Sequence, residues 1–163
     1  MSRGARQFPL ESLRTVRGIR LLALEAELQR CRDRHAQAER QRDDAQRSLE
    51  QARHARENFA VDSWARLMGE GGPTALAMDR HERRLTLLDH AIDQCRLTCE
   101  LQDAACEEAR AASEAAARAW RQARGKLDAV DEMKQGWLRD LRGRDELREE
   151  HNLDELLLRR NLR

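Results

Sequence analysis

Apolar residues in the first half of the chain recur in alternating steps of three and four. The first stripe has twelve positions, nine of them apolar: Leu21, Leu24, Leu28, Cys31, His35, Ala38, Arg42, Ala45, Leu49, Ala52, Arg56 and Phe59. A second stripe of the same kind runs from Leu85 to Arg144, with fourteen of its eighteen positions apolar. A strict seven-residue repeat of this length predicts helices that supercoil left-handed against a partner helix.

Glycine and proline gather between the two stripes, in the segment Gly69-Glu70-Gly71-Gly72-Pro73-Thr74. These residues are the strongest breakers of helical structure. The other proline, Pro9, precedes the first stripe, at a place where a helix can begin. We therefore expect one domain over residues 1–163, with a first arm at about 10–68, a loop at 69–74 and a second arm at about 75–157.

A short loop makes the other arm of the same chain the nearest available partner. The predicted fold class is all-α: a two-helix antiparallel coiled-coil hairpin with a longer, overhanging second helix. The register closest to the loop makes facing residue numbers sum to 144, which sets Leu21 opposite Ala123 and Arg42 opposite Gln102. From about Leu138 onward the second arm has no partner. Because an unpaired helix of that length is marginal in water, we expect it to be frayed until a partner binds.

Composition agrees with long helices rather than with a thick core. Charged residues make up 37% of the chain and aromatic residues only 3%, with no tyrosine. The net charge is +1, from 31 basic and 30 acidic residues, and this balance argues against nucleic acid as a partner. No apolar run approaches the ~18 residues that span a bilayer, so we expect no direct membrane insertion and a cytoplasmic location.

Catalysis, cofactors and metals are not expected. A two-helix hairpin has no concave site, and the chain lacks the G-x-x-x-x-G-K-[ST], G-x-S-x-G and H-E-x-x-H motifs. Cys95, Cys99 and Cys106 share one helical face, as metal ligands would, but all three lie on the second stripe and no fourth ligand is evident. Core packing of small, soft side chains is the favoured interpretation.

The end of the first arm carries apolar residues that leave the stripe. Val61 and Trp64 fall off the repeat if it continues through Phe59. Trp64 with Leu67 and Met68 would then be an exposed docking surface with an aromatic anchor. Alternatively, the rhythm shifts here and these residues seal the hairpin end.

The C-terminal run Asn152-Leu153-Asp154-Glu155-Leu156-Leu157-Leu158-Arg159-Arg160 is the most motif-like part of the chain. With the chain length, the longer second arm and the arginine-rich start, it resembles the FliJ/YscO family. These are the central stalk proteins of flagellar and virulence type III export, and the arginine- and alanine-rich composition is closer to the virulence branch. The resemblance spans nearly the whole chain, but most of it is architecture.

The resemblance implies a monomeric stalk whose termini enter the pore of a hexameric secretion ATPase. It also implies a link to an export-gate membrane protein and, in some members, binding of export chaperones. The residues expected to face the ATPase are Arg14, Arg17, Leu21, Leu153, Asp154, Glu155, Arg159 and Arg160. The expected gate or chaperone surface is the hairpin tip, with Trp64, Leu67 and Met68.

Two other functions fit parts of the pattern. A structural coiled-coil spacer or tether without an ATPase partner would assemble into dimers or larger species through the same stripes. A nucleic-acid-gripping arm would use the basic start of the chain, with Arg3, Arg6, Arg14, Arg17 and Arg20, although the even charge balance speaks against it.

Overall fold

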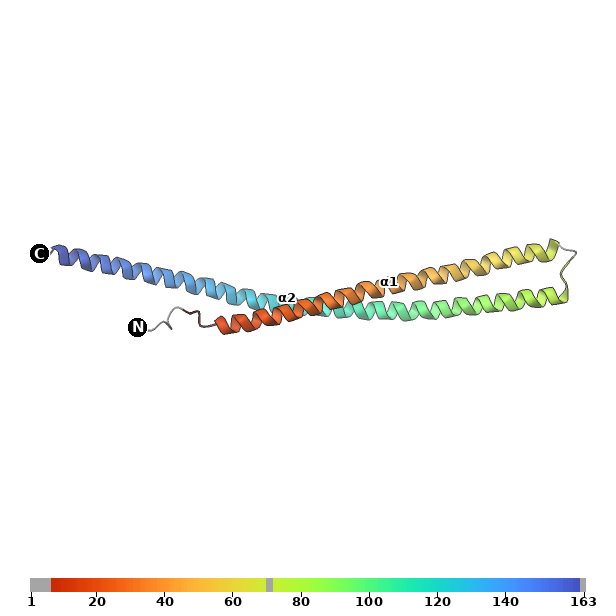
Figure 1. The fold of residues 1–163 in the computed structure, drawn as a ribbon, viewed down its shortest axis with the longest axis horizontal. Coiled ribbons are helices and arrows are strands. Elements are labelled where there is room, and N and C mark those ends of the chain that lie inside the picture. The colour runs from red at the N-terminus through yellow and green to blue at the C-terminus, as the bar shows by residue number, and fades with distance from the viewer. Residues whose placement is uncertain (1–6, 70–71, 162–163) are drawn as a thin grey trace. The chain divides into compact units, whose positions relative to one another are not determined.

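The computed structural model describes residues 7–69 and 72–161, except for the side chains of residues 156 and 158–161. Helix α1 spans Glu11–Gly69 and helix α2 spans Ala75–Asn161 (Figure 1). The described chain is helical apart from short segments before α1 and before α2. The predicted all-α hairpin with a longer second helix is confirmed, and its first arm begins and ends within one residue of the expectation.

Local hydrogen bonds and a glycine in the left-handed region define where the two helices begin. Before α1, the backbone N–H of Glu11 donates to the carbonyl of Phe8 at 3.1 Å, across Pro9. Before α2, Gly72 adopts a φ of 100°, which is in the left-handed region that favours glycine. Thr74 then caps α2, because its hydroxyl oxygen accepts from the backbone N–H of Ala77 at 3.2 Å.

The chain divides into two compact parts, and each contains a segment of both helices. The terminal part comprises the described residues of 1–28 and 116–163, and the tip part comprises Gln29–Ala115. In both parts the two segments run antiparallel. The ion pairs that show the register are Glu11–Lys134 and Arg14–Asp131 in the terminal part and Arg56–Asp89 in the tip part. The residue numbers of each pair sum to 145, and those of Ser63 and His81, which lie 2.9 Å apart, sum to 144. Both sums agree with the predicted register, because arginine and lysine side chains reach along the partner helix.

The core of each part is the predicted seam. Every position of the first stripe is buried or half-buried, and so is every position of the second stripe except Arg144. Val130 has no exposed surface at all, and the other buried seam residues are Leu21, Leu28, Cys31, Ala38, Ala45, Cys99 and Cys106. The buried seam residues of the tip part are all alanine or cysteine, and such small side chains let two helices approach closely without a thick apolar layer.

The C-terminal end of α2 is helical beyond the start of α1, and its fraying in the absence of a partner stays a prediction. It continues as a helix to Asn161, past the start of α1 (Figure 1). Strong helix formers and ion pairs one turn apart account for this order. Arg148 lies 3.8 Å from Asp145, and His151 lies 3.6 Å from Glu155.

Candidate docking surfaces

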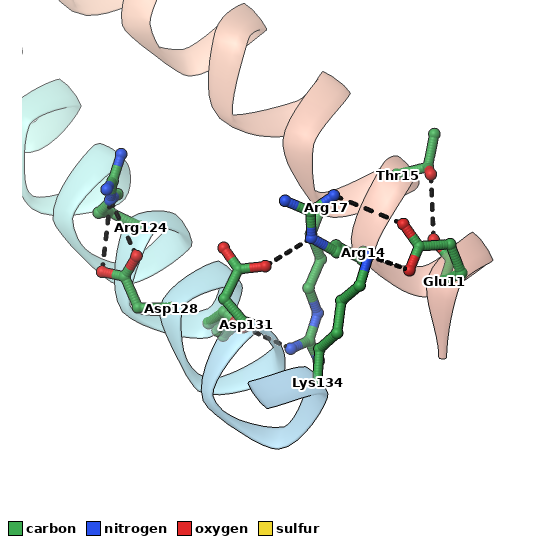
Figure 2. A network of polar contacts seen from close by, with 9 residues as sticks. Glu11, Arg14, Thr15, Arg17, Arg124, Asp128, Asp131 and Lys134 are labelled. Atoms are coloured by element: carbon green, nitrogen blue, oxygen red, sulfur yellow. Dashed lines mark hydrogen bonds and ion pairs between the residues drawn. The ribbon is translucent and has the colours of Figure 1, made fainter. Parts of the chain in front are cut away.

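A network of charged side chains joins the two helices near the start of α1 (Figure 2). The ammonium group of Lys134 lies 2.7 Å from the Glu11 carboxylate. The Arg14 guanidinium donates to Asp131 at 2.5 Å and also lies 3.5 Å from Glu11. Arg14, one of the residues expected to face the ATPase, is therefore engaged in holding α1 against α2.

Arg17 and Leu21 also face α2. The Arg17 guanidinium donates to the backbone carbonyl of Lys126 at 2.6 Å, beside Gly125, where no side chain stands in the way. Leu21 is buried in the seam. Of the three residues on α1 expected to face the ATPase, the two arginines keep partly exposed side chains and Leu21 positions the helices.

An aromatic pair lies where the two helices separate. The rings of Phe8 and Trp137 are 5.9 Å apart between centroids and tilted by 58°. Phe8 is buried by this contact, so it anchors the segment that precedes α1. Trp137 marks the end of the paired stretch of α2.

The charge network makes the terminal part sensitive to acid. The hydrogen bond from Lys134, reinforced by the charges of Lys134 and Arg14, lowers the pKa of Glu11 below its usual 4.5. A carboxyl group with a lowered pKa in the folded state stabilises the fold above its unfolded pKa. That contribution is lost as the pH falls through the lowered pKa, so it disappears below 4.5.

We expect Glu11→Gln to lower the thermal unfolding midpoint near neutral pH, and we expect its difference from the unaltered protein to disappear as the pH falls through the lowered pKa of Glu11. Circular dichroism melts over this pH range measure the difference between the two proteins. Glu25→Gln is the matched control, because Glu25 is exposed. A difference for Glu11→Gln that stays constant with pH would contradict the assignment.

The unpaired end of α2 presents leucine and acidic side chains. Leu147, Leu153 and Leu157 are exposed, and so are Asp154 and Glu155. If the seven-residue repeat of the seam continued past Arg144, its positions would be 148, 151, 155 and 158, so Leu147, Leu153 and Leu157 lie off the seam. This face therefore is not a continuation of the seam, and a longer α1 would not cover it.

Two predicted site residues of this end fall outside what can be described. Arg159 and Arg160 continue the backbone of α2, but their side chains lie outside the described residues. The structure thus brings Leu153, Asp154 and Glu155 onto one exposed helical end. It places Arg14, Arg17 and Leu21 where the two helices are still paired.

The hairpin tip is organised around His81. Its ring stacks on Phe59 at 5.6 Å between centroids and also contacts Trp64 at 6.2 Å. The Ser63 hydroxyl lies 2.9 Å from the histidine Nδ1. Trp64 nevertheless keeps 48% of its surface exposed and Met68 is exposed beside it. Trp64 therefore contacts the cluster that closes the hairpin end, and about half of its surface remains exposed to solvent.

An open hollow of about 350 Å³ lies next to this cluster. Leu67 lines it and is half-buried. The other lining residues are Phe59, Ser63, Arg66, Gly72, Thr74, Ala77, Arg80 and His81. Of the three residues expected at the gate or chaperone surface, Trp64 and Met68 are exposed side chains and Leu67 is part of this hollow.

Sequence reasoning did not single out His81 or the charge network. The register of 144 already paired Ser63 with His81, so the signal for the tip cluster was present. The Glu11–Lys134 and Arg14–Asp131 pairs lie one residue away from that register and join opposite charges. A search for complementary charges within one residue of the register would have found both.

The four cysteines occupy seam positions and form no disulfide among the described residues. Cys31, Cys99 and Cys106 are buried and Cys95 is half-buried. Over residues 7–69 and 72–161, no three His, Cys, Asp or Glu side chains are grouped as a metal site would require. Neither of the two described helices has a stretch apolar enough to cross a membrane.

No family model, curated protein or solved structure matches the chain.

Proposed function

We propose that the chain is a stalk or accessory protein of a type III secretion system. It docks its termini into a hexameric export ATPase and links that ATPase to the export-gate membrane protein, with its tip also serving as a surface for export chaperones. In this role it acts as a monomer, hydrolyses no ATP and contacts no nucleic acid.

The observation that carries the proposal is the unpaired end of α2. Helix α2 has 87 residues against 59 in α1, and its excess lies at the C-terminal end. This end presents Leu147, Leu153 and Leu157 to solvent. Exposed leucines on a helix without a partner are typical of a segment that binds another protein.

The resemblance to the FliJ/YscO family supplies the kind of partner. In that resemblance Leu153, Asp154 and Glu155 belong to the ATPase-facing end, and all three are exposed. Arg14 and Arg17 lie in the same terminal part. The exposed side of Trp64 and the neighbouring Met68 support a second surface at the tip for the gate or a chaperone.

The direct test is a pull-down with the cognate hexameric export ATPase, together with ATP turnover measured with and without this protein. We expect binding and a higher turnover when the protein is present. Turnover that is unchanged, with no ATPase retained in the pull-down, would refute the stalk function.

One observation favours the alternative of a spacer or tether. Leu97 and Leu101 are exposed one turn apart on the tip part of α2. A spacer would bury these two leucines between chains. The double variant Leu97→Asp/Leu101→Asp should then make its oligomers dissociate. A stalk should keep its effect on ATP turnover in that variant, and the two functions are thereby distinguished.

A further inference from the structure

A second heptad stripe runs along α2 in the terminal part, beside the seam. Over much of its length each of its positions lies one residue before a seam position, about 100° around the helix. It then continues past the seam to the C-terminal end. We call it the flank stripe; its positions are Ala119, Gln122, Lys126, Ala129, Met133, Gly136, Asp140, Gly143, Leu147, Glu150, Asp154 and Leu157.

The flank stripe is open to solvent along most of its length. Met133, Leu147 and Leu157 keep 51%, 65% and 57% of their surface exposed. At Gly136 and Gly143 an added Cβ would meet nothing within 4 Å. The stripe therefore presents large apolar side chains and two places where another backbone can approach closely.

A basic groove lies between the two helices at the first end of the stripe. Its volume is about 340 Å³, and its lining residues are Leu13, Val16, Arg17, Arg20, Leu24, Ala119, Gln122, Ala123 and Lys126. Three of the lining residues, Arg17, Arg20 and Lys126, are basic, and no lining residue is acidic. The groove thus combines apolar walls with positive charge.

The other end of the stripe has the opposite charge. Residues 145–155 contain six acidic residues and one arginine. Leu147 and Leu157, with Glu150 and Asp154 between them, lie on the same face of the helix. An acidic, leucine-bearing helix is the kind of ligand that a basic, apolar groove accepts.

We propose that two copies of this chain pair through their flank stripes. The two α2 helices run antiparallel, so the acidic end of each copy enters the basic groove of the other. One twofold axis makes both contacts at once and leaves no open end, as in a closed C2 dimer. The proposal does not depend on the proposed function.

The heptad spacing selects a register in which facing flank-stripe numbers sum to 276, with the twofold axis at Leu138. The stripe alternates between a and d positions of the heptad. In this register every a position faces a d position of the other copy, as antiparallel coiled coils require. Lys126 of one copy faces Glu150 of the other, and Gln122 faces Asp154. The basic end of each copy therefore faces the acidic end of the other, and the twofold axis makes each of these contacts occur twice.

The same register also matches side-chain sizes. Leu157 faces Ala119, and Leu147 faces Ala129. Met133 faces Gly143, where the open space beside the glycine accommodates the longer side chain. Large residues meet small ones at three layers, which is the arrangement that fills an interface without voids or clashes.

The dimer uses the end of α2 that the proposed function assigns to the ATPase. Leu147 and Leu157 cannot be buried by a second copy and by another protein at once. The dimer is therefore the form of the chain without its partner. Its formation is measured on the protein alone, so its failure and that of the proposed function are distinguishable.

The test exchanges the charges of one facing pair. We expect sedimentation equilibrium of the full chain to give the mass of two 18.9-kDa chains. Lys126→Glu and Glu150→Lys should each raise the dimer dissociation constant about tenfold, since each places like charges together at two symmetric contacts. The double variant should dimerise like the unaltered protein.

Mixing the two single variants gives the sharpest result. In a heterodimer of Lys126→Glu with Glu150→Lys, both facing pairs again join opposite charges, so the mixture should dimerise as tightly as the unaltered chain. Arg121→Glu and Glu149→Lys are matched controls, because they make the same charge changes off the flank stripe and should leave the dissociation constant unchanged.

Circular dichroism ensures that all variants keep their helices. A monomeric unaltered chain would overturn the proposal. So would a dimer that both single variants leave intact, or single variants that the mixture and the double variant fail to rescue.

Discussion

We expect the removal of residues 144–163 to abolish the proposed stimulation of an export ATPase, so that ATP turnover returns to the rate of the ATPase alone. The deletion takes away Leu147, Leu153 and Leu157, which are the exposed leucines of the unpaired end. It leaves Trp137 against Phe8, so the paired helices keep their last aromatic contact. The measurement is ATP turnover against the concentration of the added protein, with circular dichroism to show that the remaining helices persist.

A matched variant separates this result from the loss of the dimer. Lys126→Glu weakens the proposed pairing of two copies but leaves the C-terminal end of α2 intact. It should stimulate the ATPase at least as well as the unaltered chain, because more of the protein is free to bind. If the truncated chain still stimulates the ATPase fully, the unpaired end of α2 is not the part that binds it.

We expect Val130→Asp to destabilise the terminal part more than any other single substitution. Val130 is the one described side chain with no exposed surface. An aspartate there places a charged carboxylate where an apolar side chain was fully buried, which costs about 3–5 kcal/mol of the free energy of unfolding. Hydrogen exchange should show the loss of protection in residues 7–28 and 116–137, and thermal melts should show a lower midpoint.

The control for this substitution is Gln135→Asp, five residues further along α2. Gln135 is exposed, so the same negative charge stays in water and the midpoint should change little. Equal melting curves for Val130→Asp and the unaltered protein would show that this layer is not the core of the terminal part.

The hairpin could be predicted because its evidence is local and repeated. Residues such as Leu21 and Cys99 recur at heptad spacing, which marks one face of each arm for burial regardless of what covers it. The glycines and proline of 69–74 then leave the other arm as the nearest cover. Many equivalent layers had to agree on one register, and the contacts between the helices fall close to the predicted sum of 144, at 144 for Ser63–His81 and 145 for Arg14–Asp131.

The candidate surfaces were predicted less completely, because exposure depends on what the second helix covers. Leu21 and Leu153 are both leucines of long helices, yet Leu21 is buried in the seam against α2, whereas Leu153 is exposed, off the seam and beyond the start of α1.

The sequence by itself therefore determined which faces of two helices are buried and where the chain turns between them. Only the tertiary structure decided where the long polar side chains end, as with Arg14 on Asp131 and His81 between Phe59 and Trp64. The physical reason is the length of the side chains. Short apolar residues stay at the position that the helical repeat assigns to them, whereas arginine, lysine and the aromatic rings extend past one layer and choose among several partners.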